Sequence, residues 1–501
     1  MQAISVDDLE LARSAGRVGR APAAFLAAVF GAAIGRHGGA DSTVAAPVDW
    51  RVPFRDYLST LDVPAEAPEA VWSEAKIRLV ATHVEPVWVL ELDHTLPAAY
   101  ADGLLDSLHG ALARVVADPD TPLADLFTDA SAEQSRAADE LWFRPPVWHL
   151  VGWLRRTAER RADSVAVEEN GSRLTYRNLE EAVRATTAVL RARGARADDV
   201  VGLATDTLTD TVTTLLAVLR IGARYLLLPP TNHGDPLRRT GCRVVVGAAP
   251  PDGDDHPAGV TLLSPDDLIG AAGPLAEGER PQRAGGYLAP VDGGYVAMSA
   301  EPLFNLTAWQ LVSLSMDHDS RVLASPGVDP GALFREVVPT LAVGGTVIAR
   351  DRTPLAAQVV ADRVTHVHLR DGVELPGIPL GHLRHVCVTG GEPGPDARVV
   401  RLFARPETQV ALTARDGAAL GRPITGVTAQ VVDRTGHLAP PGVPGDLHLG
   451  GRCVADGYLA DPGRTDDRFT PDPHGPAGAR RFRTGLRVRW DDHGDLVRVP
   501  D

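Results

Sequence analysis

The feature that most constrains the fold is an alternation of short apolar segments with helical ones after residue 150. Residues 200–204 (VVGLA) and 224–228 (RYLLL) are short and apolar, and helix-like sequence stands on both sides of each. Such segments are typical of parallel strands that are buried on both faces of a sheet. The sequence therefore predicts an α/β fold in which helices cross over between parallel strands.

Length and composition describe an ordinary globular protein. The 501 residues predict two or three domains, and 44% hydrophobic with 23% charged residues is a normal balance. No apolar run approaches the ~18 residues that span a bilayer. Residues 1–16 are acidic and lack the apolar stretch of a secretion signal. We therefore expect a cytoplasmic protein with no membrane partner.

The net charge and the cysteine positions argue against nucleic-acid binding, a disulfide framework and a metal site. The formal net charge is −15, so nucleic acid is an unsuitable partner, because neutralising phosphates requires basic surface. Lys76 is the only lysine; all other basic side chains are arginines. Cys242, Cys387 and Cys453 are far apart and lie in apolar or glycine-rich sequence, which suits neither a disulfide framework nor a metal site. We expect each to be a buried free thiol.

The most specific sequence is at residues 421–496, which open with GRPITGVTAQVVDRTGHLAPPGVPGDLHLGG and close with RRFRTGLRVRWDDHGDL. This segment resembles the end of the large lobe of a nonribosomal peptide synthetase adenylation domain, and residues 151–230 match the opening of such a domain. The resemblance implies that residues 151–501 form the large N-terminal lobe of the ANL superfamily. It also implies two doubly wound α/β subdomains and a β-barrel-like subdomain from about residue 420.

Within that sequence one nucleotide-binding position is altered. The family writes Arg-Thr-Gly-Asp where this chain has Arg483, Thr484, Gly485 and Leu486. The family's Asp accepts hydrogen bonds from both ribose hydroxyls, whereas a leucine side chain accepts none. Thr484, Gly485 and Leu486 are therefore predicted to be vestigial nucleotide positions.

The phosphate-binding loop of the family is also missing from the sequence. The family has a glycine-rich loop with hydroxyls and a lysine, whose N–H groups reach the ATP phosphates. Here the matching strand, residues 294–299, runs directly into the start of the next helix, and Ser299 is the last trace of the loop. Glu301 would place negative charge near the phosphates, which argues against ATP use.

Two further family features are incomplete. Gly390, Gly391 and Glu392 match the end of a core strand, but the phrase that should follow, with an aromatic for adenine, is shortened and has no aromatic residue. Asp416 is the only acid there, and we interpret it as a turn residue.

The family's small C-terminal lobe, with its catalytic lysine, is expected to be absent because the chain stops at Asp501. Lys76 lies before residue 151, outside the adenylation-like part of the chain, so it cannot replace that lysine.

Asp329 has two interpretations. Residues 325–349 follow a family motif in which an Asp holds the α-amino group of the substrate, and Asp329 takes that position by resemblance. An Asp at a helix start is also a good N-cap, so a capping or remnant role is the preferred interpretation.

The first block, residues 1–127, resembles the second half of a condensation domain, which is one lobe of an acyltransferase-like fold. Residues 22–34 have helical apolar spacing, and a strand and an amphipathic helix that ends before Pro119 come later. The motif with paired histidines belongs to the missing first half, and no adjacent histidine pair occurs here. Residues 128–150, with Pro145 and Pro146, are predicted to be a linker.

His366 and His368 alternate along a predicted strand, which is a spacing that two metal ligands could use. No third ligand is evident, so core or surface histidines are the preferred interpretation. We therefore predict no catalytic residue, no cofactor and no metal in this chain.

The leading hypothesis is a catalytically silent condensation–adenylation didomain that serves as a scaffold in peptide or hybrid peptide–polyketide biosynthesis. It resembles silent modules of bleomycin-type assembly lines, and its expected partners are other synthetase modules and a carrier domain loaded in trans. One alternative is a repurposed enzyme that binds an amino acid or aminoacyl carrier without adenylation. A third is a plain interaction module that docks a partner enzyme.

Overall fold

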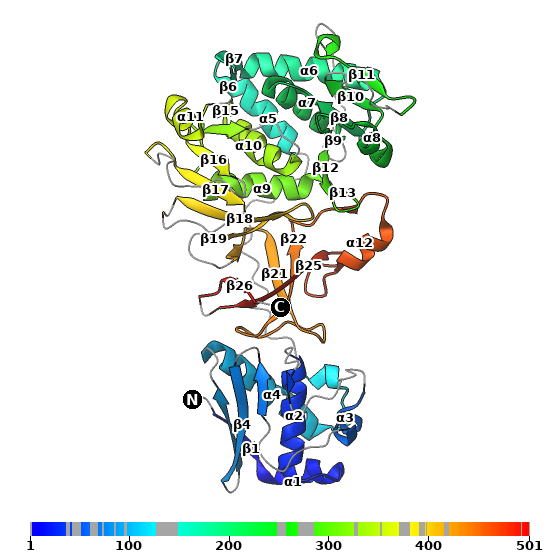
Figure 1. The fold of residues 1–501 in the computed structure, drawn as a ribbon, viewed down its shortest axis with the longest axis vertical. Helices are drawn as coiled ribbons and strands as arrows, with labels where there is room; N and C mark the ends of the chain where they lie inside the picture. The colour runs from blue at the N-terminus through cyan, green and yellow to red at the C-terminus, as the bar shows by residue number, and fades with distance from the viewer. Residues whose placement is uncertain are drawn as a thin grey trace.

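The computed structural model describes residues 3–36, 41–42, 52–60, 69–72, 75–84, 87–94, 98–126, 149–247, 257–268, 285–324, 329–350, 353–369, 381–389, 396, 398–414, 420–491 and 493–499. Figure 1 shows an N-terminal lobe at one end of the long axis, two α/β sheets at the other, and an antiparallel sheet between them. No helix within the described ranges is long and apolar enough to cross a membrane.

The N-terminal lobe is built on an antiparallel sheet of order β1-β5-β4-β3-β2. Its strands are β1 (Ala3–Asp7), β2 (Asp41–Ser42), β3 (Glu69–Trp72), β4 (Ala75–Val84) and β5 (Val87–His94). Its helices are α1 (Asp8–Arg17), α2 (Pro22–Arg36), α3 (Phe54–Thr60) and α4 (Ala98–Ala117), followed by the 3-10 turn η1 (Leu123–Leu126). The alternating parallel α/β pattern that the sequence predicts is therefore found only in the second lobe.

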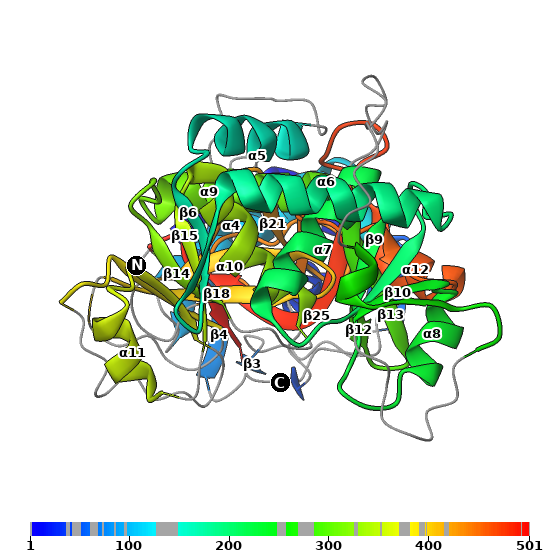
Figure 2. The same cartoon turned by 90° about the horizontal axis from the view of Figure 1, so that it is seen from above.

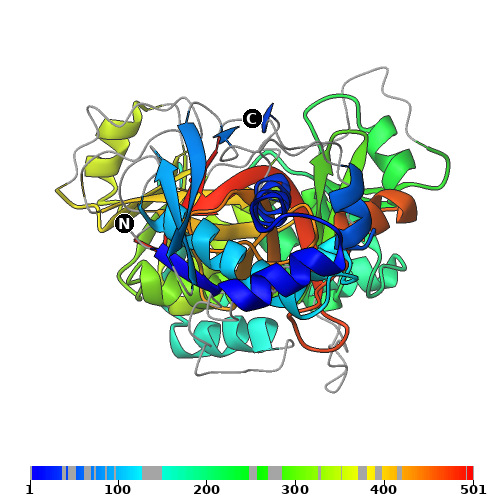
Figure 3. The same cartoon turned by 90° about the horizontal axis from the view of Figure 1, so that it is seen from below.

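Helix α2 forms the interior of this lobe because its sequence is almost entirely alanine and larger apolar residues. Phe25 and Phe30 are buried, and the ring of Phe25 meets that of Phe54 from α3 edge-on at 5.2 Å. The helices predicted at residues 22–34 and before Pro119 are confirmed as α2 and α4. In Figure 3, the view from below, the dark-blue helices α1 and α2 lie beside the blue strands of this lobe's sheet.

The structure corrects the end of the predicted linker. Helix α5 begins at His149 and continues to Arg160, so the last two residues assigned to the linker belong to the second lobe. Leu150 is buried, and its apolar side chain explains why the helix starts there. Residues 127–148 lie outside the described residues.

The first sheet of the second lobe has seven strands in the order β11-β10-β8-β9-β12-β13-β23. They are β8 (Val200–Ala204), β9 (Arg224–Leu227), β10 (Val244–Gly247), β11 (Thr261–Leu263), β12 (Gly286–Val291), β13 (Gly294–Met298) and β23 (Gly457–Tyr458). The predicted strands β8 and β9 are confirmed and pair in parallel. Helices α6 (Tyr176–Ala192), α7 (Leu208–Ile221) and α8 (Gly234–Thr240) accompany this sheet, with the turn η2 (Pro265–Leu268).

The second sheet has nine strands in the order β20-β19-β18-β17-β16-β14-β15-β6-β7. They are β6 (Val165–Glu169), β7 (Ser172–Thr175), β14 (Arg321–Ala324), β15 (Thr346–Ala349), β16 (His366–Leu369), β17 (His385–Thr389), β18 (Val399–Arg405), β19 (Gln409–Ala414) and β20 (Arg422–Pro423). The β6–β7 turn is Asn170-Gly171, and both have positive φ, which favours a tight hairpin.

Three helices complete this part: α9 (Ala300–Ser313), α10 (Pro330–Val343) and α11 (Leu355–Ala361). Helix α10 is buried from Pro330 to Ala342, and it touches β14 and β15 of one sheet and β12 of the other. It therefore lies between the two sheets, and its first turn is surrounded by residues of both. Figure 2 shows α5 and α6 on the outside of the second lobe.

The C-terminal subdomain, which the sequence predicts to be barrel-like, is an antiparallel sheet of order β21-β22-β25-β24, with β26 paired to β25. Within the described residues, β21 and β24 do not pair with each other. The strands are β21 (Val427–Val432), β22 (Gly445–Gly451), β24 (Phe469–Pro471), β25 (Arg480–Trp490) and β26 (Leu496–Arg498), and helix α12 covers Pro462–Arg468. The long strand β25 pairs with β22, β24 and β26 along its length, and its register with β22 shifts around Gly485, which has φ 72°.

Candidate functional site

The candidate site lies at the start of helix α10, beyond the carboxyl end of β14. Strand β14 ends at Ala324 and α10 begins at Pro330. In α/β proteins with open parallel sheets, ligands bind at the carboxyl ends of the strands, so this edge is where a small molecule would be expected. Residues from the seven-stranded sheet reach the same place.

Asp329 caps helix α10. One carboxylate oxygen, Oδ1, accepts hydrogen bonds from the backbone N–H groups of Gly331 (2.9 Å) and Ala332 (3.0 Å), which have no partner inside the helix. The other oxygen, Oδ2, lies 4.0 Å from Nη2 of Arg335, and the side chain is 45% exposed. The geometry thus assigns Oδ1 to the helix and leaves Oδ2 the freer of the two oxygens.

Protein side chains fill the space beside this cap. The rings of Tyr225 and Tyr287 stand 5.4 Å apart, and the Tyr225 hydroxyl donates to the Pro330 carbonyl oxygen at 2.8 Å. A methyl group placed on Gly331 would come within 3.0 Å of Gln409 Nε2 and 3.2 Å of the Tyr287 hydroxyl oxygen. Burial raises the pKa of both tyrosines far above the usual range, so both stay neutral.

Arg335 lies beneath the cap, and its positive charge has only weak partners. It is 5% exposed, its Nη1 donates to Gln409 Oε1 at 3.3 Å, and its nearest carboxylate oxygen is the one on Asp329 at 4.0 Å. Within the described part of the chain, Arg335 Nε and Gln409 Nε2 are buried without a hydrogen-bond partner. Gln409 also has a φ of 54°, in the left-handed region. This corner of the fold therefore carries unsatisfied polar groups and backbone strain.

The junction between β13 and α9 contains a single residue. Strand β13 ends at Met298, Ser299 is the N-cap residue, and α9 begins at Ala300. The Ser299 side chain makes no capping hydrogen bond. Glu301 in the first turn is 60% exposed and lies 4.0 Å from Arg452 Nε. A one-residue connection has too few backbone N–H groups to wrap a triphosphate.

Thr484 and Leu486 have structural contacts in strand β25. The Thr484 hydroxyl donates to the Leu447 carbonyl oxygen (2.8 Å) and accepts from the Leu486 N–H (3.1 Å). Leu486 is half-buried and packs against the main hydrophobic core. Gly485 between them has φ 72°, a conformation that a side chain rarely adopts.

The remaining residues singled out in the sequence fall into two groups. Gly390, Gly391, Glu392 and Asp416 lie outside the described residues. Lys76 lies in β4 of the N-terminal lobe, a different sheet from those around α10.

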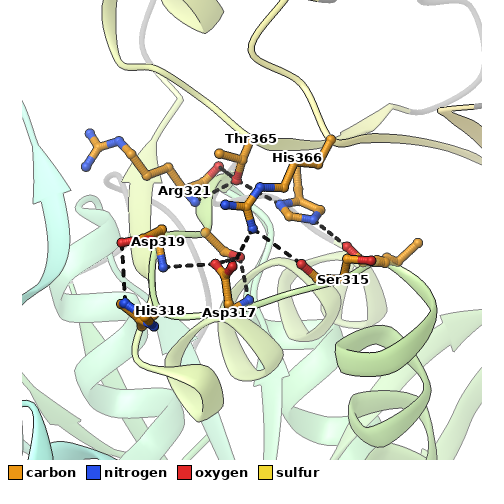
Figure 4. Close-up of polar contacts among 10 residues, drawn as sticks. Ser315, Asp317, His318, Asp319, Arg321, Thr365 and His366 are labelled. Atoms are coloured by element: carbon orange, nitrogen blue, oxygen red, sulfur yellow. Dashed lines mark hydrogen bonds and ion pairs between the residues drawn. The ribbon is translucent and has the colours of Figure 1, made fainter.

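The two histidines of the alternating pair lie in β16. His366 begins the strand, and its two ring nitrogens lie 2.8 Å from the Leu314 carbonyl oxygen and from the Thr365 hydroxyl oxygen (Figure 4). Burial lowers the pKa of His366 to about 4, and burial with nearby Arg335 lowers that of His368 to about 3. No group of three or more potential metal ligands occurs in the described ranges.

Figure 4 shows the polar network around His366. Asp317 accepts hydrogen bonds from the Asp319 N–H (3.0 Å) and from Arg384 Nη1 (2.8 Å), and Thr365 bonds to the backbone of Arg321. Because these residues stand at the amino ends of β14, β16 and β17, the network joins strand starts, and we assign it a structural role.

Sequence reasoning missed the residues that surround Asp329 in space. Tyr225, Tyr287 and Gln409 come from three separate strands, and only the fold brings them to α10. Arg335 had a signal, since a lone arginine in the apolar helical run GALFREVVPTLAV is expected to be buried and therefore to need a partner.

Comparisons with known proteins agree with this fold. Residues 154–283 match the family model of the AMP-binding enzymes. Phosphinothricin tripeptide synthetase PhsB from Streptomyces viridochromogenes is 32% identical over 413 residues, which cover 72% of this chain and 34% of the relative. The chain thus spans about a third of that relative's length.

Two solved structures show the same fold at low sequence identity. The nonribosomal peptide synthetase FmoA3 (S1046A, AMPPNP-bound form) superimposes on 100% of this chain and 68% of its own, with a TM-score of 0.83 and 20% identity. The N-terminal subdomain of NpsA from Klebsiella oxytoca covers 70% of this chain and 98% of its own, with a TM-score of 0.61 and 22% identity. The second lobe therefore has the fold of the N-terminal lobe of adenylation domains, and the chain is similar in sequence to a peptide synthetase over 72% of its length.

Proposed function

We propose that this chain is a catalytically silent component of a nonribosomal peptide synthetase, whose second lobe keeps the adenylation fold without its reaction. In this proposal the chain is a scaffold that maintains the spacing between neighbouring synthetase domains. A carrier domain beside it is loaded in trans by another adenylation domain.

The observation that carries this proposal is the junction between β13 and α9. Transfer of an adenylyl group requires stabilisation of charge on the phosphates, which is the largest catalytic contribution in reactions of this type. Ser299 is the only residue between strand and helix, and the first turn of the helix presents the carboxylate of Glu301. Backbone donors are too few here, and the nearby charge has the wrong sign, so the residues present do not fit ATP.

Two other places support the same conclusion. Leu486 takes part in core packing where the family has a carboxylate for the ribose. Beside Asp329, the side chains of Tyr287 and Gln409 crowd Gly331 and Tyr225 contacts Pro330, so an amino acid that entered would meet filled space. Both changes favour packing over ligand binding.

In this proposal the N-terminal lobe is a partial condensation lobe. Its five antiparallel strands and their helices carry an interior of their own around Phe25, Phe30 and Phe54. Such a lobe holds its shape without a reactive histidine pair, which suits it to docking rather than to peptide-bond formation.

The direct test is ATP–pyrophosphate exchange by this chain with a panel of amino acids, beside an active adenylation domain as positive control. We expect no exchange above background for any amino acid, and no rise in melting temperature with ATP and Mg²⁺. Exchange at a rate typical of the control would overturn the proposal.

A repurposed binding site at Asp329 is the second candidate. It is favoured by the geometry of the carboxylate, because Oδ1 caps the helix while Oδ2, in a side chain that is 45% exposed, has only Arg335 at 4.0 Å. This oxygen could accept a hydrogen bond from an amino group.

Asp329→Asn separates the two candidates, because asparagine caps a helix about as well as aspartate but removes the charge. Asp461→Asn, at the N-cap of α12, is the matched control. If amino acids bind to the unmodified chain and to the Asp461 variant but not to the Asp329 variant, the repurposed site is supported. Absence of binding to all three supports the scaffold.

A further inference from the structure

A groove lies between helices α5, α6 and α7 on the outside of the second lobe. Its volume is about 430 Å³, part of which is open to solvent, and Leu341 of α10 also lines it. Helix α5 contacts both α6 and α10, and α6 contacts α7, so four helices surround the groove. Figure 2 shows α5 and α6 at the surface of this lobe, where another segment can reach the groove.

The walls of the groove are mostly apolar. The aliphatic side chains that line it are Val151 and Leu154 from α5, Leu179 and Val183 from α6, and Leu216 and Leu219 from α7. Val151, Leu154 and Leu216 are only half-buried. Apolar surface that is gathered in one concave place and left in contact with water is unfavourable, and it marks a place where another apolar group binds.

The two charged residues that line the groove neutralise each other. Arg220 Nη1 donates to Glu180 Oε1 at 2.9 Å, and Arg220 Nη2 donates to Glu180 Oε2 at 2.6 Å. Because both oxygens of the carboxylate are engaged by one guanidinium, this ion pair has no unpaired charge to offer a ligand. The groove therefore suits an apolar occupant rather than an ion.

The linker that precedes α5 has a sequence of the matching kind. Its last eight residues, 141–148, are LWFRPPVW, with three aromatic and two aliphatic side chains, in a chain that is only 5% aromatic. Trp148 and Val147 stand three and four positions before Val151, which lines the groove. On a helix that spacing places side chains on one face. The apolar pattern that lines the groove therefore continues past the start of α5 into the linker.

Attachment and charge favour the linker over a second copy of the chain or a separate protein. The linker is joined to α5 at its first residue, His149, and a short tether gives an effective concentration on the order of millimolar. Asp139 and Glu140 come directly before the apolar run, and α5 presents the exposed side chains of Arg155 and Arg156. The charges of the two segments are therefore complementary.

We propose that the groove between α5, α6 and α7 is a docking site for residues 141–148 of the linker, with their aromatic side chains as anchors. Docking would leave residues 127–140 as the tether between the two lobes, and it would shorten the greatest reach of that tether from about 80 Å to about 50 Å. The groove would thus set how far the lobes can separate. Docking depends on the apolar walls and not on whether the lobe adenylates, so this inference goes beyond the scaffold proposal.

The first experiment is limited digestion of the whole chain with chymotrypsin, which cuts after aromatic residues, with the cuts within 141–149 followed by mass spectrometry. The groove variants are Leu154→Ser and Leu216→Ser, and we expect each to speed cleavage in this segment at least tenfold. Leu262→Ser is the matched control, because Leu262 is 39% exposed in β11, away from the groove. Leu154→Met keeps the volume and should keep cleavage slow.

The second experiment does not depend on how well the groove variants fold. A labelled peptide of residues 139–148 is titrated into the unmodified chain and into a chain with Trp142→Ser, Phe143→Ser and Trp148→Ser, whose own segment can no longer occupy the groove. We expect the peptide to bind the triple variant at least tenfold more tightly than the unmodified chain. Adding Leu216→Ser to the triple variant should abolish this binding, and adding Leu262→Ser should preserve it.

Equal cleavage of the unmodified chain and the groove variants would overturn the proposal, as would a peptide that binds neither chain or both with one affinity. Sedimentation tests the other occupant: a dimer of the unmodified chain that Leu154→Ser dissociates would assign the groove to a second copy and contradict the linker. Pyrophosphate exchange stays a separate test, so the scaffold proposal and this one can fail independently.

Discussion

The polar groups at the two edges of the nine-stranded sheet differ in whether they have hydrogen-bond partners. At the amino edge, Asp317, Thr365 and His366 have hydrogen-bond partners within 3.1 Å (Figure 4). At the carboxyl edge, Arg335 Nε and Gln409 Nε2 are buried without partners in the described structure. The three amino-edge residues named here have hydrogen-bond partners, whereas the two carboxyl-edge atoms named here have none.

This difference distinguishes polar groups that stabilise the fold from polar groups that are available to a ligand. A network in which each group is paired fixes the strand starts and has no capacity left for a ligand. Unpaired buried groups cost about 1–3 kcal/mol each and mark places where an ancestral ligand or a remaining task explains the cost. A packed carboxyl edge is what the scaffold proposal predicts for this lobe.

The largest expected effect comes from opening the filled edge. Tyr225 is fully buried, so Tyr225→Ala should lower the free energy of unfolding by about 3–5 kcal/mol through a cavity beside Tyr287. Tyr225→Phe, which removes only the hydrogen bond to Pro330, should lower it by about 1 kcal/mol. Urea unfolding measures both. A small loss for the alanine variant would mean that this edge is a ligand pocket rather than a packed interior.

The next effect tests the amino edge through pH. The pKa of His366 falls from 6.5 to about 4 on folding, chiefly by burial, so between these values the unfolded chain holds more protons than the folded one. Stability is therefore complete above pH 6.5 and decreases as pH falls toward 4, by roughly 3 kcal/mol. His366→Gln should remove this part of the slope.

The control for that measurement is His318→Gln, which changes a half-exposed histidine of the adjoining turn. It should keep the same dependence as the unmodified chain. Identical slopes for all three proteins would show that the amino edge is more open to water than the closed network implies.

Leu486→Asp sharpens the comparison at the C-terminal sheet. The change removes a half-buried apolar side chain from the core and should lower the free energy of unfolding by about 2 kcal/mol. Leu486→Met, which keeps the volume, should cost less than about 1.5 kcal/mol. Neither variant should gain pyrophosphate exchange. If Leu486→Asp alone restored exchange, the rest of the nucleotide site would be intact, against our proposal.

The smallest effect concerns the cap on α10. Asp329→Ala should destabilise the protein by about 1 kcal/mol because Gly331 and Ala332 lose their acceptor, whereas Asp329→Asn should cost only a few tenths. Thermal unfolding of the two variants measures the difference. A cost for Asp329→Asn equal to that of Asp329→Ala would assign the effect to the charge facing Arg335 rather than to the cap.

Local patterns predicted much of the secondary structure. The strands at 200–204 and 224–227, the helix after Pro22 and the helix that ends before Pro119 are confirmed, because each has strong apolar periodicity. The barrel-like form of the C-terminal subdomain stays a prediction, while the order in which its strands pair around β25 comes from the structure, since sequence alone does not specify it. The linker end was two residues late because Leu150 is buried.

The sequence by itself determined the α/β class of the second lobe, the one-residue junction at Ser299 and the loss of a carboxylate at Leu486. These properties depend on residue type and on short spacing along the chain. Tertiary structure alone decided that Tyr225, Tyr287 and Gln409 crowd the start of α10, and that Arg405 and Arg468 both donate to the carbonyl oxygen of Thr484. Those residues are distant in sequence, and only the pairing and packing of whole sheets brings them together.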